Sequence, residues 1–530
     1  MMHNADTRHK WLEYLPLLLA LVALLCALLI INSKKLYWFD EAYTAKVLSS
    51  GSFSTVWNVI TDDYDVVPPF YYFVGFAWTR IAGTSDLSLR LFTSLGIMVS
   101  LAVVWFMLRR TYGMWPSSAG AFGVLLLSYQ VLRQNAEARF YGLYMALVAL
   151  ALFSYDEFAR QERPSAWLYF ATAVLHGALV TTHTGGFFYS GVILLSLLIT
   201  DWRAGRFRLK AYLPIVMGWM VFVPWLSVFL RQIRGVRDYT WILPPTLTDL
   251  FVTYLVGLSI AIVPVLVLLL LLLWTILQRV KNEDRANQHV PAKVQLPGYH
   301  LLVVALFFAA MPLIFWIVSN TLVSFYVERY MLPSLLGYSI LLTMICYRLK
   351  WFTSVEGTSV GPKALSTTVD IAIIVLVAVS IISPLASALV RGTDPLPDEL
   401  IGPYDHSDLP IVVEDPLSYL SQIRYASHPE RYVYVADHEA VYDGRSKIND
   451  RAVEALLLGL QRHYPDLNIV STSDFLATQD RFLVLDWNES SWAELRVKEN
   501  ENYHSTVLNP GTTEPLVLLV VRHNTVENEK

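Results

Sequence analysis

Long apolar stretches separated by short polar segments fill the first three quarters of the chain. Runs such as Leu15–Ile31, Leu258–Ile276 and Ile371–Val390 carry no charged residue. Each approaches the roughly 20 residues that an α-helix, rising about 1.5 Å per residue, needs to cross a bilayer core of about 30 Å. The pattern predicts a polytopic α-helical membrane protein with about eleven transmembrane helices. We expect them at residues 15–31, 91–108, 117–134, 140–155, 166–182, 187–200, 211–230, 257–277, 299–319, 330–347 and 369–390.

One further apolar stretch, Pro68–Ala82, differs from the predicted spans. It is short, opens with two prolines and is rich in aromatic residues. A segment of this kind lies along the membrane interface more readily than it crosses the bilayer. We therefore expect juxtamembrane helices within a long first outer loop, residues 32–90.

The pattern changes after Val390. Short β-like runs at residues 411–413, 432–436, 482–485 and 516–521 alternate with helical spacing at 416–426 and 450–463. This alternation predicts a soluble α/β domain, a small open sheet flanked by helices. The chain is thus expected to divide into a membrane module, residues 1–390, and a C-terminal α/β domain, residues 391–530.

Composition and charge support this division. The chain is 55% hydrophobic and 16% charged, whereas a soluble domain carries about 25% charged residues. Its net charge of −4 is unevenly distributed, because residues 391–530 hold 24 Asp and Glu against 12 Lys and Arg. A basic membrane part joined to an acidic soluble part argues against nucleic acid as a partner.

The loops between the predicted spans differ in basic charge. One alternate set, which includes the N-terminus, holds 17 Lys and Arg residues, more than the opposite set. The positive-inside rule places the more basic set in the cytoplasm. We therefore expect a multi-pass protein of the cytoplasmic (inner) membrane with a cytoplasmic N-terminus and an extracytoplasmic C-terminal domain.

Ionisable side chains gather at the outer ends of the predicted spans, and the first group is Asp40 and Glu41. They lie between aromatic residues just after the first span. Such a carboxylate pair can accept a proton from a hydroxyl, because burial and like charge raise one pKa toward a useful range. A helix N-terminus, which favours acidic residues in its first turn, explains the pair equally well.

Two further motifs each combine a glutamate with an arginine. Glu137 and Arg139 lie where the third span meets the fourth, and Glu328, Arg329 and Tyr330 open the tenth. In each motif, an arginine held by one carboxylate can present its planar guanidinium to an anion. An interfacial arginine that reaches toward water is the alternative. Two copies on the side where basic residues are scarce favour an anion site.

Two other features add to this outer face. His183, followed by Thr184-Gly185-Gly186, can bring a ring nitrogen and backbone N–H groups near a phosphate or sugar, although a lone histidine is more often satisfied locally. Arg231, Arg234 and Arg237 follow the seventh span. The face therefore combines cationic residues with an acidic pair, which suits an anionic lipid head group next to a general base.

In this order, the motifs resemble the GT-C superfamily of lipid-linked-sugar glycosyltransferases. Within it, the resemblance is to the branch of protein O-mannosyltransferases, the lipid A aminoarabinose transferase and the Rgt-type galacturonic acid transferases. The matching segments are Asp40-Glu41, Pro68–Tyr72, Ser88–Arg90 with Arg109–Gly113, Glu137–Tyr141, His183 and Glu328–Tyr330. One position departs from the family, because Val66-Val67 stands where members often have His or Lys before the two prolines.

The resemblance implies an integral-membrane inverting glycosyltransferase. It would move a sugar from a polyprenyl-phosphate donor to a hydroxyl or amine of a lipid, glycan or protein acceptor on the extracytoplasmic face. Asp40 would be the base, and Glu41 would orient Asp40 or a cation. A divalent ion, Mg²⁺ or Mn²⁺, held by these two carboxylates is allowed but not required. The residues implied at the donor phosphate and sugar are Arg139, Glu137, His183, Glu328, Arg329, Tyr330 and Arg231.

Two other classes of protein remain open from the sequence. A transporter or flippase of lipid-linked sugars keeps its charged groups near the bilayer midplane, often in two related halves, whereas here the charges lie at the outer rim. A non-catalytic member of the superfamily would use its acidic outer domain to bind envelope partners. The Val66-Val67 departure keeps this third interpretation open.

Overall fold

The computed structural model describes residues 10–62, 66–237, 242–257, 297–354, 363–404, 408–437, 448–487, 492–498, 500–510 and 515–523, with Val267, Leu270, Leu271 and Trp274. The predicted span at 257–277 and the loop that follows it lie almost entirely outside these residues. The side chain of Arg237 is also outside the described part.

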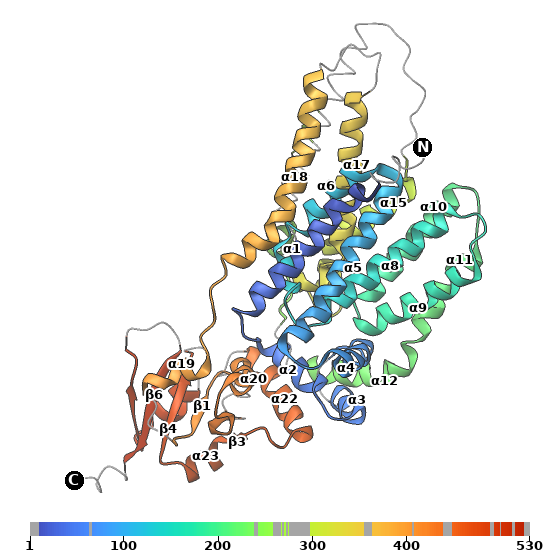
Figure 1. Ribbon diagram of the computed structural model, residues 1–530. Helices are drawn as coiled ribbons and strands as arrows, with labels where there is room; N and C mark the ends of the chain where they lie inside the picture. The colour runs from blue at the N-terminus through green and yellow to red at the C-terminus, as the bar shows by residue number, and fades with distance from the viewer. Residues whose placement is uncertain are drawn as a thin grey trace, which may run out of the picture.

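The membrane part is a bundle of helices that stand side by side (Figure 1). Six helical segments of the described residues are long and apolar enough to cross a bilayer: Leu12–Asn32, Asp86–Tyr112, Tyr141–Arg160, Leu209–Gly235, Tyr299–Thr321 and Ser366–Leu389. The chain is therefore a multi-pass membrane protein. The helices of the bundle are α1 (Leu15–Asn32), α5 (Asp86–Tyr112), α6 (Met114–Leu125), α8 (Tyr141–Arg160), α9 (Ala166–Thr182), α10 (Gly186–Arg203), α11 (Leu209–Met220), α12 (Leu226–Arg237), α15 (Tyr299–Ala309), α16 (Met311–Thr321), α17 (Ser334–Ser354) and α18 (Lys363–Leu389).

One predicted span is not a single helix. Residues 117–134 form most of α6, then a break, then the short helix α7 (Tyr129–Gln134). The apolar pattern runs through the break, but Ser128 begins a new helix by accepting a hydrogen bond from the Val131 amide. The break matters for the site, because the turn between α7 and α8 carries Glu137 and Arg139.

Three short helices fill the predicted first outer loop: α2 (Phe39–Leu48), α3 (Phe53–Asp62) and α4 (Phe70–Ala82). They lie together at one end of the bundle (Figure 1). Helix α4 starts directly after Pro69 and has 13 residues. At about 1.5 Å per residue it is roughly 20 Å long, which is too short to cross a bilayer core of about 30 Å.

The C-terminal part contains a six-stranded sheet in the order β3-β2-β1-β4-β6-β5. The strands are β1 (Ile411–Val413), β2 (Tyr432–Ala436), β3 (Ile469–Ser471), β4 (Arg481–Asp486), β5 (Tyr503–Val507) and β6 (Leu516–Arg522). The first four run parallel, and β6 pairs antiparallel with both β4 and β5. The structure thus confirms the predicted α/β fold. The sequence pattern did not reveal β3 and β5, which are the short edge strands.

Helices cover both faces of this sheet. Alternate residues Val412, Val433 and Phe482 face one core with Phe475 of α23 (Thr472–Thr478). Their neighbours Ile411, Tyr432 and Leu483 belong to the core on the other side, with α20 (Pro416–Tyr425) and α22 (Ile448–His463). Helix α20 packs on α2, and α22 packs on α3, so the sheet region lies against the first outer loop (Figure 1).

Two glycines allow a close crossing of α5 and α8. A Cβ atom on Gly96 would overlap the backbone of Gly142, and one on Gly142 would overlap the backbone of Thr93. Because the helices approach so closely, the Thr93 hydroxyl donates a hydrogen bond to the Arg139 carbonyl at 2.8 Å. The crossing therefore fixes the backbone of Arg139 just before α8 begins.

Candidate active site

Asp40 lies in the first turn of α2, where it meets two arginines from distant parts of the chain. Its Oδ2 atom is 3.7 Å from Arg139 Nη2 and 3.5 Å from Arg329 Nη2. Arg329 comes from a 3₁₀ helix, Glu328–Met331, that precedes α17. The Asp40 side chain is 21% exposed, so this carboxylate remains accessible while both guanidinium groups are largely buried.

Arg139 is held in place at its guanidinium group and at its backbone carbonyl. Its Nη1 atom donates to Thr44 Oγ1 at 2.8 Å and to the Asp40 carbonyl at 3.3 Å. Its carbonyl accepts from Thr93, as described above. Helix α2 and the α5–α8 crossing thus set the position of this guanidinium relative to the Asp40 carboxylate.

Glu41, the second acid of the predicted pair, is in a different environment. It is 2% exposed. Its Oε1 accepts from Arg90 Nε at 3.0 Å and from the Ala138 amide at 2.8 Å, and its Oε2 accepts from Arg90 Nη2 at 3.2 Å. A carboxylate engaged in this way anchors α2 to α5 and to the segment before Arg139. We therefore interpret Glu41 as a positioning residue.

The two Glu–Arg motifs are built differently from the expectation. Glu137 does not hold Arg139 by its side chain but accepts from Arg133 Nε at 2.6 Å and Gln134 Nε2 at 2.8 Å. The reason is helical spacing, since Arg133 and Glu137 are four residues apart and side chains at that interval share one face. Glu328 likewise accepts a hydrogen bond from Gln130 Nε2 at 2.6 Å, and Arg329 pairs with Asp40 instead.

Arg133 was not among the residues predicted from the sequence, although its i,i+4 spacing to Glu137 indicates that the two side chains lie on one face of a helix. Its guanidinium carbon is 5.8 Å from the centre of the Trp38 ring, and that of Arg329 is 5.2 Å from the same centre. We call Arg133, Arg139 and Arg329 the arginine cluster. Two of its guanidinium groups lie beside the Trp38 ring and two face the Asp40 carboxylate, a gathering of charged donors that suits a bound anion.

His183 packs beside this cluster. Its ring centre is 4.8 Å from that of Tyr330 and 5.0 Å from that of Phe140, on which it stacks. Its Nδ1 atom accepts from the Gly185 amide at 3.0 Å. Burial, with Arg139 and Arg329 nearby, lowers the pKa of His183 to about 3. The ring is therefore neutral and carries its proton on Nε2, as a hydrogen-bond donor.

The loop after His183 requires glycine at position 185. A Cβ atom there would lie 2.8 Å from His183 Nδ1 and 2.9 Å from the Tyr144 hydroxyl. We expect Gly185→Ala to displace the His183 ring and to destabilise the protein by about 1–3 kcal/mol, the usual cost of overpacking. Thermal unfolding in detergent measures this. Gly191→Ala on α10 is the matched control, because its Cβ would meet nothing within 4 Å; equal melting temperatures for the two variants would contradict the prediction.

Arg231 does not join the arginine cluster. Its Nη2 atom donates to the Thr61 carbonyl of α3 at 2.8 Å. No hydrogen bond or ion pair within the described residues connects it to Asp40. The structure thus brings together Asp40, Arg139 and Arg329 and places Glu137, Glu328, His183 and Tyr330 around them, but it gives Arg231 a separate contact.

A divalent ion, which the resemblance allows but does not require, would have to be held by Asp40 and Glu41, and the surroundings of these two carboxylates do not favour one. Both oxygens of Glu41 accept hydrogen bonds from protein donors, and Asp40 Oδ2 faces two guanidinium groups that repel a cation. Within the described ranges, no group of three or more His, Cys, Asp or Glu side chains could hold a metal ion.

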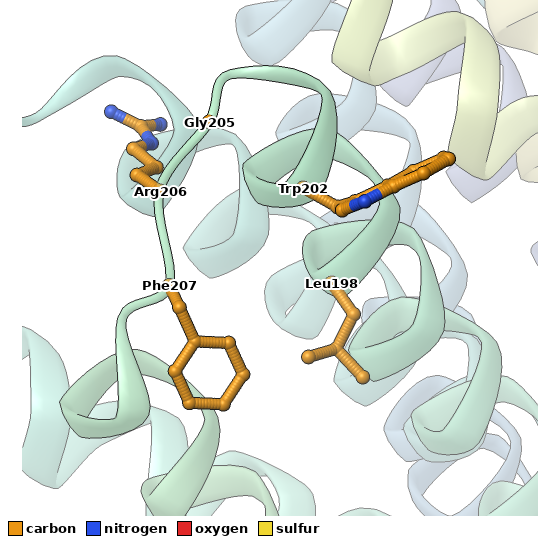
Figure 2. A pocket seen from close by; sticks show the side chains of 5 residues that line it. All are labelled: Leu198, Trp202, Gly205, Arg206 and Phe207. Atoms are coloured by element: carbon orange, nitrogen blue, oxygen red, sulfur yellow. The ribbon is translucent and has the colours of Figure 1, made fainter.

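One surface hollow of the described residues lies elsewhere. It has a volume of about 440 Å³ and is lined by Leu198, Trp202, Gly205, Arg206 and Phe207. Figure 2 shows Leu198 and Phe207 beside this space, with Arg206 pointing away from Leu198 and Trp202. Helix α10 starts near His183, and Trp202 lies 16 residues after that start, which corresponds to about 24 Å along the helix. The hollow is therefore remote from Asp40.

Comparisons with known proteins agree with the resemblance. Residues 66–228 match the family model described as dolichyl-phosphate-mannose-protein mannosyltransferase. The structure is similar to that of ArnT from Cupriavidus metallidurans, a crystal structure bound to undecaprenyl phosphate, with a TM-score of 0.58 and 14% identity over 97% of this chain and 98% of that chain. The chain has the fold of ArnT. This match confirms the fold predicted from the sequence motifs.

The similarity to ArnT extends through both parts of the chain, because it covers 97% of the residues and so includes the C-terminal sheet region. The oligosaccharyltransferase AglB from Archaeoglobus fulgidus, in complex with an inhibitory peptide and a dolichol-phosphate, is more distant, with a TM-score of 0.46 and 12% identity over 90% of this chain and 70% of that chain. No curated protein shows significant sequence similarity. The family match spans Glu137, Arg139 and His183, but neither Asp40 nor Arg329.

Proposed function

We propose that this GT-C protein is an inverting glycosyltransferase that uses a sugar linked to polyprenyl phosphate. One observation carries the proposal: Asp40 Oδ2 lies 3.5–3.7 Å from two guanidinium groups at one end of a membrane-embedded bundle. A carboxylate base and an anion-binding pair are thus adjacent, as transfer from a phosphate-linked sugar requires. ArnT, which has the same fold, binds undecaprenyl phosphate.

The proposed reaction uses only groups of this chain. Arg139 and Arg329 bind the phosphate of the donor, and Asp40 takes the proton from the acceptor hydroxyl or amine. The acceptor atom attacks the anomeric carbon as the bond from that carbon to the phosphate oxygen breaks, which inverts the anomeric centre. The departing polyprenyl phosphate gains negative charge, and the two guanidinium groups stabilise it.

Several features of the sequence and fold support a location for this chemistry. Arg109, Arg160 and Arg203 lie in the last turns of α5, α8 and α10, at the ends opposite to those near Asp40, so the positive-inside rule favours an extracytoplasmic active site. In this proposal, residues 1–390 form the membrane module of a cytoplasmic (inner) membrane protein and residues 391–530 its extracytoplasmic domain. The acceptor is a lipid, glycan or protein of the cell envelope.

The test is a transfer assay with the purified full-length protein in vesicles. Supplied with polyprenyl-phosphate-linked sugars and a membrane extract as acceptor, the protein should release polyprenyl phosphate and form a glycosylated product. The same vesicles, assayed for movement of the lipid between leaflets, distinguish a transferase from a flippase. Lipid movement without glycosyl transfer would overturn the proposal in favour of transport.

The guanidinium groups are expected to contribute to donor binding. Arg139→Ala and Arg329→Ala should each weaken binding of polyprenyl phosphate by about 10- to 100-fold, since a hydrogen bond to a charged group contributes about 1.5–3 kcal/mol. Equilibrium binding of the radiolabelled lipid measures this. Arg231→Ala, which removes an arginine that donates to the Thr61 carbonyl and not to Asp40 within the described residues, is the control and should bind normally. Unchanged affinity in both cluster variants would contradict phosphate binding at Asp40.

A further inference from the structure

Helix α20 of the C-terminal sheet region forms a charged contact with the start of α5. Arg424 donates to Asp86 Oδ1 from Nε at 3.1 Å and from Nη2 at 2.6 Å. The Tyr425 hydroxyl donates to the other oxygen, Asp86 Oδ2. Both side chains of the ion pair are about one quarter exposed. Two adjacent residues of α20 thus occupy both oxygens of one carboxylate.

Tyr37 extends this contact toward α2. Its backbone amide donates to the Tyr425 hydroxyl at 3.1 Å, and its own hydroxyl donates to the Asp86 carbonyl at 3.1 Å. The ring is 1% exposed. The guanidinium carbons of Arg424 and Arg90 lie 4.8 Å and 4.7 Å from its centre. Tyr37 therefore contacts the C-terminal region and Arg90 at the same time.

Arg90 completes the connection to the site. It forms the two hydrogen bonds to Glu41 described above and donates to the carbonyls of Lys35 at 2.8 Å and Leu36 at 3.1 Å. Its side chain is 1% exposed. Glu41 is the neighbour of Asp40 and also accepts from the Ala138 amide, next to Arg139. A continuous set of contacts thus joins α20 to both sides of the Asp40–Arg139 pair.

The linker before the sheet region holds the same segment from a second direction. The Asp394 amide donates to the Lys34 carbonyl at 2.8 Å, and the Leu36 amide donates to Asp394 Oδ2 at 3.1 Å. Lys34 Nζ also donates to the Leu389 carbonyl at the end of α18, at 2.9 Å. Residues 34–37, which lead directly into α2, are therefore fixed largely by residues beyond 388.

We propose that the C-terminal sheet region positions the catalytic carboxylate, and that Arg424 and Tyr425 are its positioning residues. The inference rests on the proposed function and adds a role for the region outside the membrane module. Arg424 makes no hydrogen bond or ion pair with Asp40 or the arginine cluster in the described part of the chain, and it acts through Tyr37, Arg90 and Glu41 on the orientation of α2. A displacement of about 1 Å at a reacting group costs as much as 100-fold in rate, so loss of this contact should lower kcat.

A second ion pair across the same interface supplies a matched control. Lys46 Nζ lies 2.8 Å from Asp466 Oδ2, with side chains 29% and 67% exposed. This pair also joins α2 to the C-terminal region, but neither residue contacts Tyr37 or Arg90 through a hydrogen bond or ion pair in the described part of the chain. Asp466→Asn therefore removes an interface charge without touching the proposed connection.

The experiment combines kinetics with hydrogen exchange on the full-length protein. Arg424→Ala should lower kcat by about 10- to 100-fold while KM for the donor changes by less than about threefold. Amide exchange in residues 39–48 should become faster, because α2 loses part of its support. Arg424→Lys should recover part of both effects, and Asp466→Asn should show neither. Tyr425→Phe, which removes only a hydroxyl, serves if Arg424→Ala does not fold.

The outcomes separate this inference from the proposed function. Unchanged kcat in Arg424→Ala and Tyr425→Phe would overturn it, as would equal losses of kcat and donor affinity with normal exchange in α2. If the wild-type protein transfers no sugar, the proposed function fails, but the exchange measurement still tests the positioning. Faster amide exchange in α2 of Arg424→Ala then supports the positioning role. Exchange in Arg424→Ala equal to that in Asp466→Asn overturns it.

Discussion

Asp40→Asn should lower sugar transfer by about 100- to 10,000-fold, the usual contribution of a general base. The amide cannot take the acceptor proton, although it has nearly the size of the carboxylate. The same change removes the acidic partner of Arg139 and Arg329. Binding of polyprenyl phosphate should therefore be retained or become tighter. The measurements are turnover with saturating donor and equilibrium binding of the radiolabelled lipid.

The control for Asp40→Asn is Asp62→Asn, at the end of α3 in the same loop. Asp62 is about half exposed and lies 3.6 Å from His463 Nε2, away from the arginine cluster. It should keep wild-type activity. Transfer by Asp40→Asn within about tenfold of wild type would remove Asp40 as the base, and loss of lipid binding in that variant would contradict the competition between carboxylate and phosphate.

The largest expected loss of stability follows from breaking the buried pair between Glu41 and Arg90. Both side chains are at most 3% exposed. Glu41→Gln leaves the Arg90 guanidinium buried without its counter-ion and should destabilise the protein by about 3–5 kcal/mol. Chemical denaturation or thermal unfolding in detergent measures this. Replacing both residues, Glu41→Leu with Arg90→Met, should recover part of the loss, because no unpaired charge is left in the interior.

An exposed ion pair provides the contrast. Glu13 pairs with Arg109 and is 52% exposed, so Glu13→Gln should cost no more than about 1 kcal/mol. A Glu41→Gln variant as stable as Glu13→Gln would mean that the buried pair does not hold α2 to α5.

The membrane helices and the α/β region could be predicted because apolar runs and strand periodicity are local properties of the sequence. The break at Ser128 could not, since an apolar run leads directly into it and the capping hydrogen bond that begins α7 is seen only in the structure. The edge strands β3 and β5 were missed for a related reason. They are short and partly exposed, so alternation is weak in them.

Most residues of the candidate site could be predicted from the sequence, but the ion pairs that they form with one another could not. Asp40, Arg139 and Arg329 could be identified as candidates because charged residues are costly near a membrane and are seldom placed there without a function. Which carboxylate meets which guanidinium depends on turn geometry and on helices that cross far from one another in sequence. Because Glu137 and Arg139 are close in sequence, an ion pair between them was expected. In the structure, Glu137 instead pairs with Arg133, which lies four residues earlier. The contact of Arg231 with Thr61 depends on tertiary packing alone.

The wide sequence separation of the groups around Asp40 affects when they can meet during biosynthesis. Arg139 is made about 100 residues after Asp40 and Arg329 about 290 residues after it. At about 5–20 residues per second, a ribosome needs roughly 15 to 60 seconds for the longer interval. Asp40 and Arg139 can pair early, but Arg329 arrives with the later membrane insertions and α20 later still. A chain released early therefore lacks Arg329 and α20. The site around Asp40 can be complete only after the whole chain has been synthesised.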